Sequence, residues 1–134
     1  MVAVRVLADS INSFTIEVVG MVASGDTAAL NLTNSRKWRV PAWVRLDSVQ
    51  HAIQDGLTCF LWWEHAKEHD SLIMPLAGRG LFPPAHGHTY QNPEKHREGH
   101  TGDVILTTDG VWPEGEMRAF SLIIDFEKQR ERVS

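Results

Sequence analysis

The sequence predicts an all-β protein, an antiparallel β-sandwich or jelly roll of about eight strands. Three observations lead to this prediction. Apolar and polar side chains alternate with a period of two, as on strands with one buried face. Turn residues such as Gly25 and the pair Asp55-Gly56 separate these runs at short intervals. No segment has the 3.6-residue period of an amphipathic helix of normal length.

The strands can be followed along the chain. In the first run, 13–22, Phe14 and Ile16 alternate with Thr15 and Glu17. A proline inside the third run predicts an edge strand or a bulge there, and Asp55-Gly56 predicts a hairpin. The last run has the clearest alternation. The remaining strands are expected at 27–32, 38–46, 49–53, 57–63, 71–77, 103–108 and 117–126.

Length and composition favour one globular domain. The chain has 134 residues, with 43% apolar and 22% charged. We expect the sandwich to span 1–126 and a charged tail to follow at 127–134. The net charge of −4 argues against nucleic-acid binding, which normally uses a basic face. No apolar run approaches the roughly 20 residues of a membrane span, and the N-terminus does not resemble a signal peptide.

One segment, 78–102, interrupts the strand pattern. It contains three prolines, five glycines and four of the seven histidines. Such a composition resists regular structure, and a long polar connection in a compact domain is usually functional or disordered. We therefore expect a long loop here, and we expect any localised function to lie in it.

Residues 65–69 match H-x-x-E-H, a zinc-peptidase motif. That chemistry requires a helix, which places the two histidines on one face beside a catalytic glutamate. Here the motif lies between two predicted strands, with room for a turn and not for a helix. The sequence predicts a polar turn. The single cysteine, Cys59, excludes an internal disulfide and is expected to be a small buried hydrophobe.

A second metal motif is approximated by Gly80, His86, His88 and Glu94, which resemble the first motif of cupins. In a strand, histidines two apart share a face and can hold one metal ion. The match is imperfect, because five residues separate His88 from Glu94 and the closing glycine comes one position late. Arg118 also stands where the second motif has its third histidine. A cupin-like metal-binding protein or enzyme is kept as an alternative, and the leading expectation is a non-enzyme without a cofactor.

From residue 38 to about 127 the chain resembles small structural proteins of tailed bacteriophages. The likeness is carried by "RLDSVQHAIQDGLTCFLWWE", "SLIMPLAGRG", "HTGDVILTTDG" and "FSLIIDFEKQ", in that order. It does not cover the first 37 residues or the segment 82–100. The resemblance implies a β-sandwich virion component, most simply a capsid decoration or cement protein on the outer surface of the shell. A head-tail connector or tail component of the same fold is the alternative.

This resemblance implies the partners. They are the major capsid protein and other copies of the chain, a trimer included, in a virion made in the bacterial cytoplasm. Edge strands, end loops and buried aromatic anchors suit such contacts. An aromatic anchor could equally plug the end of its own sandwich. The residues expected to contact a partner are Phe82, His86, His88, Tyr90, His96, His100 and Trp112.

Overall fold

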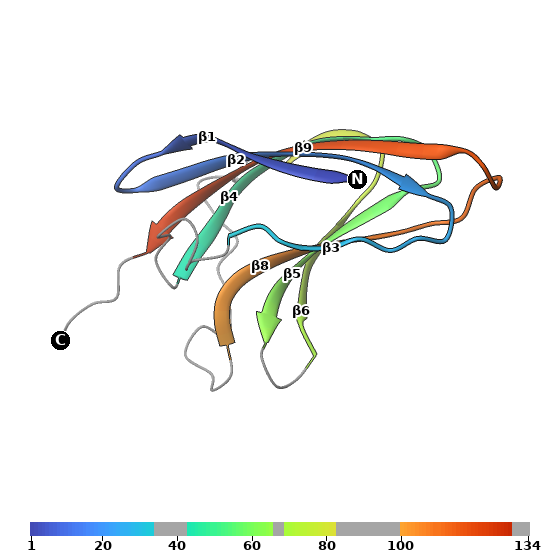
Figure 1. Cartoon of the computed structure of the whole chain (residues 1–134). Helices are drawn as coiled ribbons and strands as arrows, with labels where there is room; N and C mark the ends of the chain where they lie inside the picture. Colours follow the sequence, from blue (N-terminus) through green and yellow to red (C-terminus); the bar gives the residue numbers. More distant parts are fainter. Residues whose placement is uncertain (34–42, 66–68, 83–99, 130–134) are drawn as a thin grey trace.

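The computed structural model describes residues 1–33, 43–65, 69–82 and 100–129. In this part of the chain nine strands form two antiparallel sheets, one across the top of Figure 1 and one below it, which confirms the predicted all-β sandwich. The strands are β1 (Val2–Asp9), β2 (Ser13–Ala23), β3 (Ala29–Asn31), β4 (Trp43–Ile53), β5 (Thr58–His65), β6 (Ser71–Leu76), β7 (Arg79–Phe82), β8 (His100–Asp109) and β9 (Met117–Gln129).

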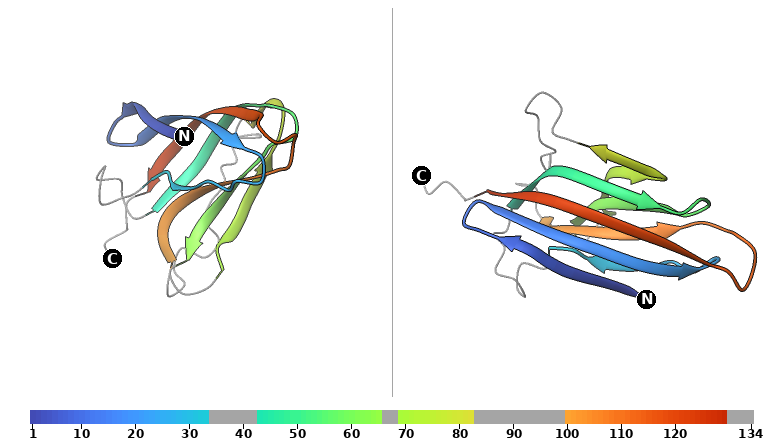
Figure 2. Two further views of the ribbon diagram at one scale, coloured as in Figure 1. Left: turned by 45° about the vertical axis from the view of Figure 1, so that its right-hand side comes forward. Right: turned by 90° about the horizontal axis from the view of Figure 1, so that it is seen from above.

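The larger sheet has five strands in the order β1-β2-β9-β4-β7. Figure 2 shows β1 at one edge and β7 at the other. The two long strands β2 and β9 pair along their whole length, with Phe14 opposite Phe126. Even-numbered apolar residues of both strands face inward, as their alternation predicts, because successive side chains point to opposite faces of a sheet.

The smaller sheet has four strands in the order β3-β8-β5-β6. Its two adjacent tryptophans point to opposite faces. Trp63 is buried between the sheets. Trp62 lies on the outer face, where its indole N–H donates to Thr107 Oγ1 at 2.8 Å and its ring lies 6.1 Å from that of Phe60. The outward tryptophan thus meets its own sheet.

The core consists of the inward side chains of both sheets. Burying one such aliphatic or aromatic side chain contributes about 1.5–3 kcal/mol. The largest fully buried residues come from strands of both layers and their connections: Phe14, Ile16, Val18, Leu32, Leu46, Leu57, Leu61, Leu76, Leu106, Leu122, Ile124 and Phe126.

The hairpin predicted at Asp55-Gly56 is wrong. β4 belongs to the five-stranded sheet and β5 to the four-stranded sheet, so the turn carries the chain from one layer to the other. Both sides of β4 are already paired, with β9 and with β7. Gly56 still supplies the positive φ, +90°, that a tight turn needs. Asp-Gly therefore indicated the turn but not the pairing of its flanking strands.

Other boundaries also differ from those predicted. β1 was not expected at all. The predicted loop at 78–102 is wrong at both ends, because 79–82 form β7 and β8 begins at residue 100. The rest of that segment lies outside the described residues. β9 continues to residue 129, so the first residues of the predicted tail are strand. β4 is an interior strand with a bulge between Leu46 and Ser48, and the proline that predicted an edge or bulge lies outside the described residues.

Candidate functional site: a groove beside β7

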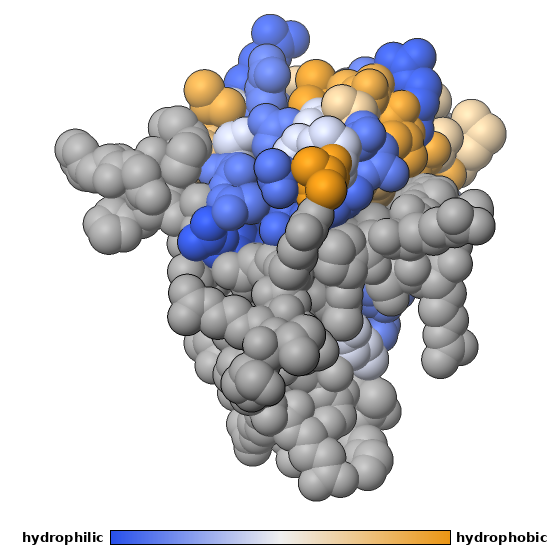
Figure 3. All heavy atoms as spheres, turned by 90° about the vertical axis from the view of Figure 1, so that its left-hand side faces the viewer, coloured by the Kyte–Doolittle hydropathy of each residue, from blue (hydrophilic) through white to orange (hydrophobic). Residues whose placement is uncertain are grey.

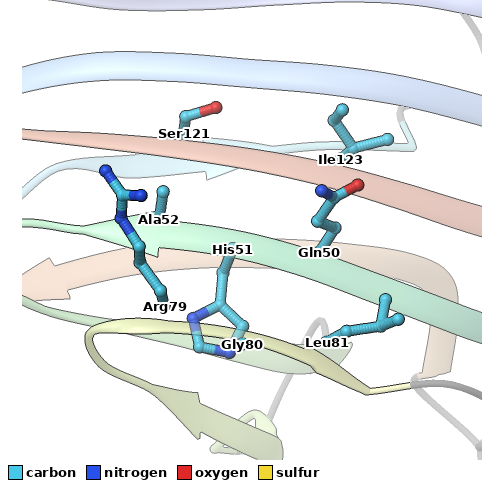
Figure 4. Close-up of a pocket in the computed structure, with 8 residues that line it drawn as sticks. All are labelled: Gln50, His51, Ala52, Arg79, Gly80, Leu81, Ser121 and Ile123. Atoms are coloured by element: carbon cyan, nitrogen blue, oxygen red, sulfur yellow. The ribbon is translucent and has the colours of Figure 1, made fainter.

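A shallow groove lies on the outer face of the five-stranded sheet beside its edge strand β7 (Figure 4). Its volume is about 490 Å³ and it opens to solvent. Three neighbouring strands, β9, β4 and β7, supply the side chains. We call it the β7 groove. Its lining residues are Gln50, His51, Ala52, Arg79, Gly80, Leu81, Ser121 and Ile123.

Strand register explains the shape of the groove. Ala52 lies opposite both Ser121 and Arg79 in its two ladders. The small side chains of Ala52 and Ser121 leave the floor low. One row further along, Gln50 lies between Ile123 and Leu81, and in Figure 4 these longer side chains rise around the floor. Ala52 and Ser121 thus form a low floor, bordered by this taller row and, on β7, by the long side chain of Arg79.

His51 belongs to the opposite side of the sheet. In Figure 4 its ring points toward the backbone of Gly80 and away from the face on which Gln50 and Ala52 project. The imidazole is buried, and its Nδ1 lies 3.0 Å from the carbonyl oxygen of Gly78. Because a carbonyl only accepts, Nδ1 carries the proton. A Cβ on Gly80 would stand 2.7 Å from His51 Nε2, so a side chain at this position would displace the imidazole.

The groove is suited to binding. It offers the Arg79 guanidinium, the amide of Gln50, the hydroxyl of Ser121 and the apolar surfaces of Leu81 and Ile123. Among the described lining residues there is no carboxylate, and the imidazole of His51 is turned away. Proton transfer needs an acid or base within hydrogen-bond reach of the reacting atoms. The lining therefore provides a cation, two neutral polar groups and apolar contact area.

The predicted partner contacts have different positions. Phe82 ends β7 with 37% of its surface exposed, and its ring stacks on His51 at 5.7 Å between centroids. Trp112 is only 7% exposed, with its indole N–H donating to the carbonyl of Glu116 at 2.8 Å. Trp112 thus plugs the end of its own sandwich and is not available as a surface anchor. Phe82 remains accessible.

Most of the histidine-rich segment lies outside the described residues, namely His86, His88, Tyr90, Glu94 and His96. The backbone of His100 begins β8, opposite His65 of β5. Its side chain is not among those described.

The H-x-x-E-H motif is described at its two ends. His65 ends β5 as a buried residue and His69 is exposed. The strands on either side, β5 and β6, pair antiparallel, the arrangement expected around a turn. Residues 66–68 themselves lie outside the described part of the chain.

Within the described ranges, no group of three or more His, Cys, Asp or Glu side chains is arranged to hold a metal ion. Cys59 is fully buried on β5, and burial raises the pKa of its thiol to about 12. A thiol with so high a pKa is a poor nucleophile at neutral pH. The described residues also contain no helix long and apolar enough to cross a membrane.

Comparison with known proteins gives no family assignment. No protein-family model and no curated protein matches the chain. Among solved structures, a cupin superfamily protein from Desulfitobacterium hafniense DCB-2 is similar over 92% of this chain and 76% of that one, with 9% identity and a TM-score of 0.33. TmCBM61, solved in complex with β-1,4-galactotriose, is similar over 90% and 66%, with 17% identity and a TM-score of 0.35.

Sequence reasoning missed the β7 groove. Its members Arg79 and Leu81 fell inside the predicted loop, and Gln50, Ser121 and Ile123 were not singled out. One signal was present. Ile123 interrupts the polar face of β9, where the sequence otherwise alternates Ser121, Asp125 and Glu127 with core residues. Single apolar residues are common on protein surfaces, so this signal alone does not identify a groove.

Proposed function

We propose that this chain is a non-enzymatic virion structural protein, a capsid decoration or cement subunit that binds the major capsid protein shell through the β7 groove. The phage assignment comes from the sequence resemblance at 38–127. The observation that supports a binding role is the groove itself, with exposed apolar residues beside it on an edge strand. A rigid antiparallel sandwich with accessible edges suits a subunit that attaches to a repetitive surface.

The chemistry of β7 indicates what the groove can bind. Leu81 is 60% exposed on the groove side and Phe82 is partly exposed on the other side. Desolvated apolar and aromatic side chains supply most of the binding energy of protein interfaces. Arg79 adds a planar donor that can pair with a carboxylate in two-point geometry. The groove therefore fits a protein segment that carries an apolar side chain close to an acidic one.

A charge placed in the groove tests this role. Leu81→Asp should weaken co-sedimentation with shells of the major capsid protein from the same phage at least about tenfold, or about 1.4 kcal/mol. The matched control is Val111→Asp, which makes the same kind of change at an 82% exposed position on the β8–β9 connection. Both variants should retain the wild-type melting temperature. Equal binding by Leu81→Asp and wild type would refute the docking site.

The alternatives give different results. A head-tail connector would bind a portal or tail complex and leave closed shells unbound. The metal hypothesis predicts stoichiometric zinc, iron or manganese by elemental analysis, lost in the double variant His86→Ala/His88→Ala. Stoichiometric metal that depends on both histidines would favour the cupin-like alternative over the virion role.

A further inference from the structure

The four edge strands of the two sheets differ in how their open edges are protected. β3 has three residues and β7 has four. β6 contains Pro75, and its ladder with β5 is interrupted by a register shift. Short length, proline and irregularity are the features by which natural sheets avoid pairing with other chains. β1 is longer, with eight residues and no proline or lysine, and its register shift lies beyond Val6, so that Val2 to Val6 form a regular edge.

The side chains of β1 are unusual for an open edge. Its core-facing row is Val2, Val4 and Val6, with no charge pointing inward. Val6, Leu7 and the nearby Ile11 are exposed large hydrophobes. Figure 3 shows the end of the molecule that carries the β1–β2 turn, where hydrophobic residues reach the surface among hydrophilic ones. A regular, valine-rich edge without an inward-pointing charge favours pairing with another strand.

The hydrogen bonds to β2 show which backbone groups of β1 remain open. Met1 and Met21 exchange both backbone hydrogen bonds, each at 2.9 Å. In an antiparallel ladder such pairs recur at every second residue, so Ala3 and Arg5 also bond toward β2. The N–H and C=O groups of Val2, Val4 and Val6 then point to the other side. No strand of the described ranges pairs with that side of β1.

We propose that β1 pairs antiparallel with β1 of a second copy, which joins two five-stranded sheets into one continuous sheet. The two-fold axis passes between the two Val4 residues. Val4 then bonds to its own counterpart, and Val2 bonds to Val6 of the second copy. This arrangement makes about six backbone hydrogen bonds and aligns six valines along one face. An identical strand is its natural occupant, because antiparallel pairing of one strand with itself is two-fold symmetric.

Charge and strand regularity select this register. With the axis at Val4, Arg5 lies opposite Ala3 of the second copy. An axis at Arg5 would place two guanidinium groups directly opposite, which is unfavourable, and would extend the ladder into the bulge between Val6 and Ala8. An axis at Ala3 would leave fewer of the outward groups paired. The Val4 register uses all of the regular part of β1.

This inference is independent of the proposed function, since it concerns only the chain and its copy. It gives a dimer in place of the trimer considered from the sequence. The contact covers about five residues of each chain, and small interfaces are weak. We therefore expect a reversible dimer that is populated at concentrations on the order of 100 μM. Sedimentation equilibrium should show a mass that rises with concentration from 15.1 kDa toward twice that value.

Engineered cysteines test the register. Opposite residues that do not exchange hydrogen bonds have Cα atoms about 4.5 Å apart, within disulfide reach. Ala3→Cys mixed with Arg5→Cys should form a covalent dimer on oxidation. Either variant alone should not form this dimer, because its two cysteines would lie diagonally across the two β1 strands, about 7–8 Å apart. Cys59 does not compete because it is buried. Loss of the exposed Arg5–Glu17 ion pair in Arg5→Cys should change the stability of the fold little.

A surface charge gives a second test. Val6→Lys should weaken dimerisation at least about tenfold, since a lysine would enter the row of valines. Ile11→Lys, the same change in the β1–β2 turn, should leave it unaltered, and both variants should melt like the wild type. A constant mass of one chain at all concentrations would overturn the proposal. Cross-linking of Ala3→Cys with itself would overturn the register.

Discussion

Phe82 and Trp112 are both aromatic residues next to turn-forming sequence, yet they have different environments in the structure. Trp112 lies between β8 and β9, with its backbone N–H bonded to Ser24 Oγ at 2.8 Å and its indole N–H bonded to Glu116. The Arg118 guanidinium carbon lies 5.7 Å from its ring centre. Phe82 stacks on His51 and is partly exposed at a sheet edge.

The difference shows what decides the role of an aromatic residue at the end of a sandwich. The backbone beneath Trp112 is unusually close, because a Cβ on Gly110 would lie 2.2 Å from the Gly56 carbonyl oxygen. Two glycines allow the chain to pass under the indole, and both of its donors are satisfied. Phe82 is the last residue of the edge strand β7, and its ring stacks on His51 while part of the residue stays exposed. Trp112 closes the end of the core, whereas Phe82 is available for contact with a partner.

The largest effect should come from removing Trp112. Trp112→Ala should lower the free energy of unfolding by about 3–5 kcal/mol, because the change leaves a cavity and removes the indole donor of the Glu116 carbonyl. Phe82→Ala, the matched change at the exposed corner, should cost less than about 1 kcal/mol. Urea unfolding followed by circular dichroism measures both. Equal losses for the two variants would contradict the contrast between them.

Gly110→Ala should cause the second-largest loss of stability. Gly110 has φ of +151°, and the added methyl group would collide with the Gly56 carbonyl. Strain of this kind costs about 1–3 kcal/mol before the collision is added. Gly115→Ala is the control, because Gly115 also has a positive φ but has no atom within 4 Å of the new Cβ. If both variants melted at the same temperature, the close approach under Trp112 would not be important.

Gly80→Ala tests the Phe82 corner. The new Cβ would stand 2.7 Å from His51 Nε2 and push the imidazole away from Gly78 and Phe82. Overpacking of this kind costs about 1–3 kcal/mol. Combining it with His51→Ala should remove most of the added cost, since the two residues are in contact. Strictly additive losses in this double-mutant cycle would show that the imidazole does not lie against Gly80.

The smallest change in stability should come from replacing Asp47, which lies on the same strand as His51. Burial, followed by repulsion from Glu127, raises the pKa of this carboxyl above its ordinary 3.8, while Arg45 opposes the rise. Its Oδ1 is buried without a hydrogen-bond partner. When folding raises the pKa of a carboxyl, the folded protein loses stability as the pH rises through that pKa. Asp47→Asn should therefore melt slightly higher than wild type at pH 7, with no advantage below pH 3.8.

Parts of this fold follow directly from the sequence. The alternation of Phe120, Leu122, Ile124 and Phe126 indicates β9 and its buried face, and the structure confirms both. β1 was missed because Val6, Leu7 and Ala8 are consecutive apolar residues, and the register shift at this point explains the broken alternation. β7 was missed because four residues between glycine and proline resemble a loop.

The groove could not be predicted for a different reason. Ser121, Ala52 and Arg79 form one row only because β4 lies between β9 and β7 in a particular register. Strand order and register depend on contacts between distant segments, and local patterns do not encode them. The Asp55-Gly56 turn illustrates the same limit, since its local sequence is compatible with a hairpin and with a crossing between sheets.

The central claim is that the β7 edge of the sandwich, with its groove, binds a partner and the Trp112 end does not. Amide hydrogen exchange of the chain, free and bound to capsid shells, tests it most directly. The account predicts slower exchange on binding for β7 and the adjoining part of β4, around residues 50–52, with no change at 110–116. Protection confined to 110–116, or the absence of any change at β7 when the chain is fully bound, would contradict it.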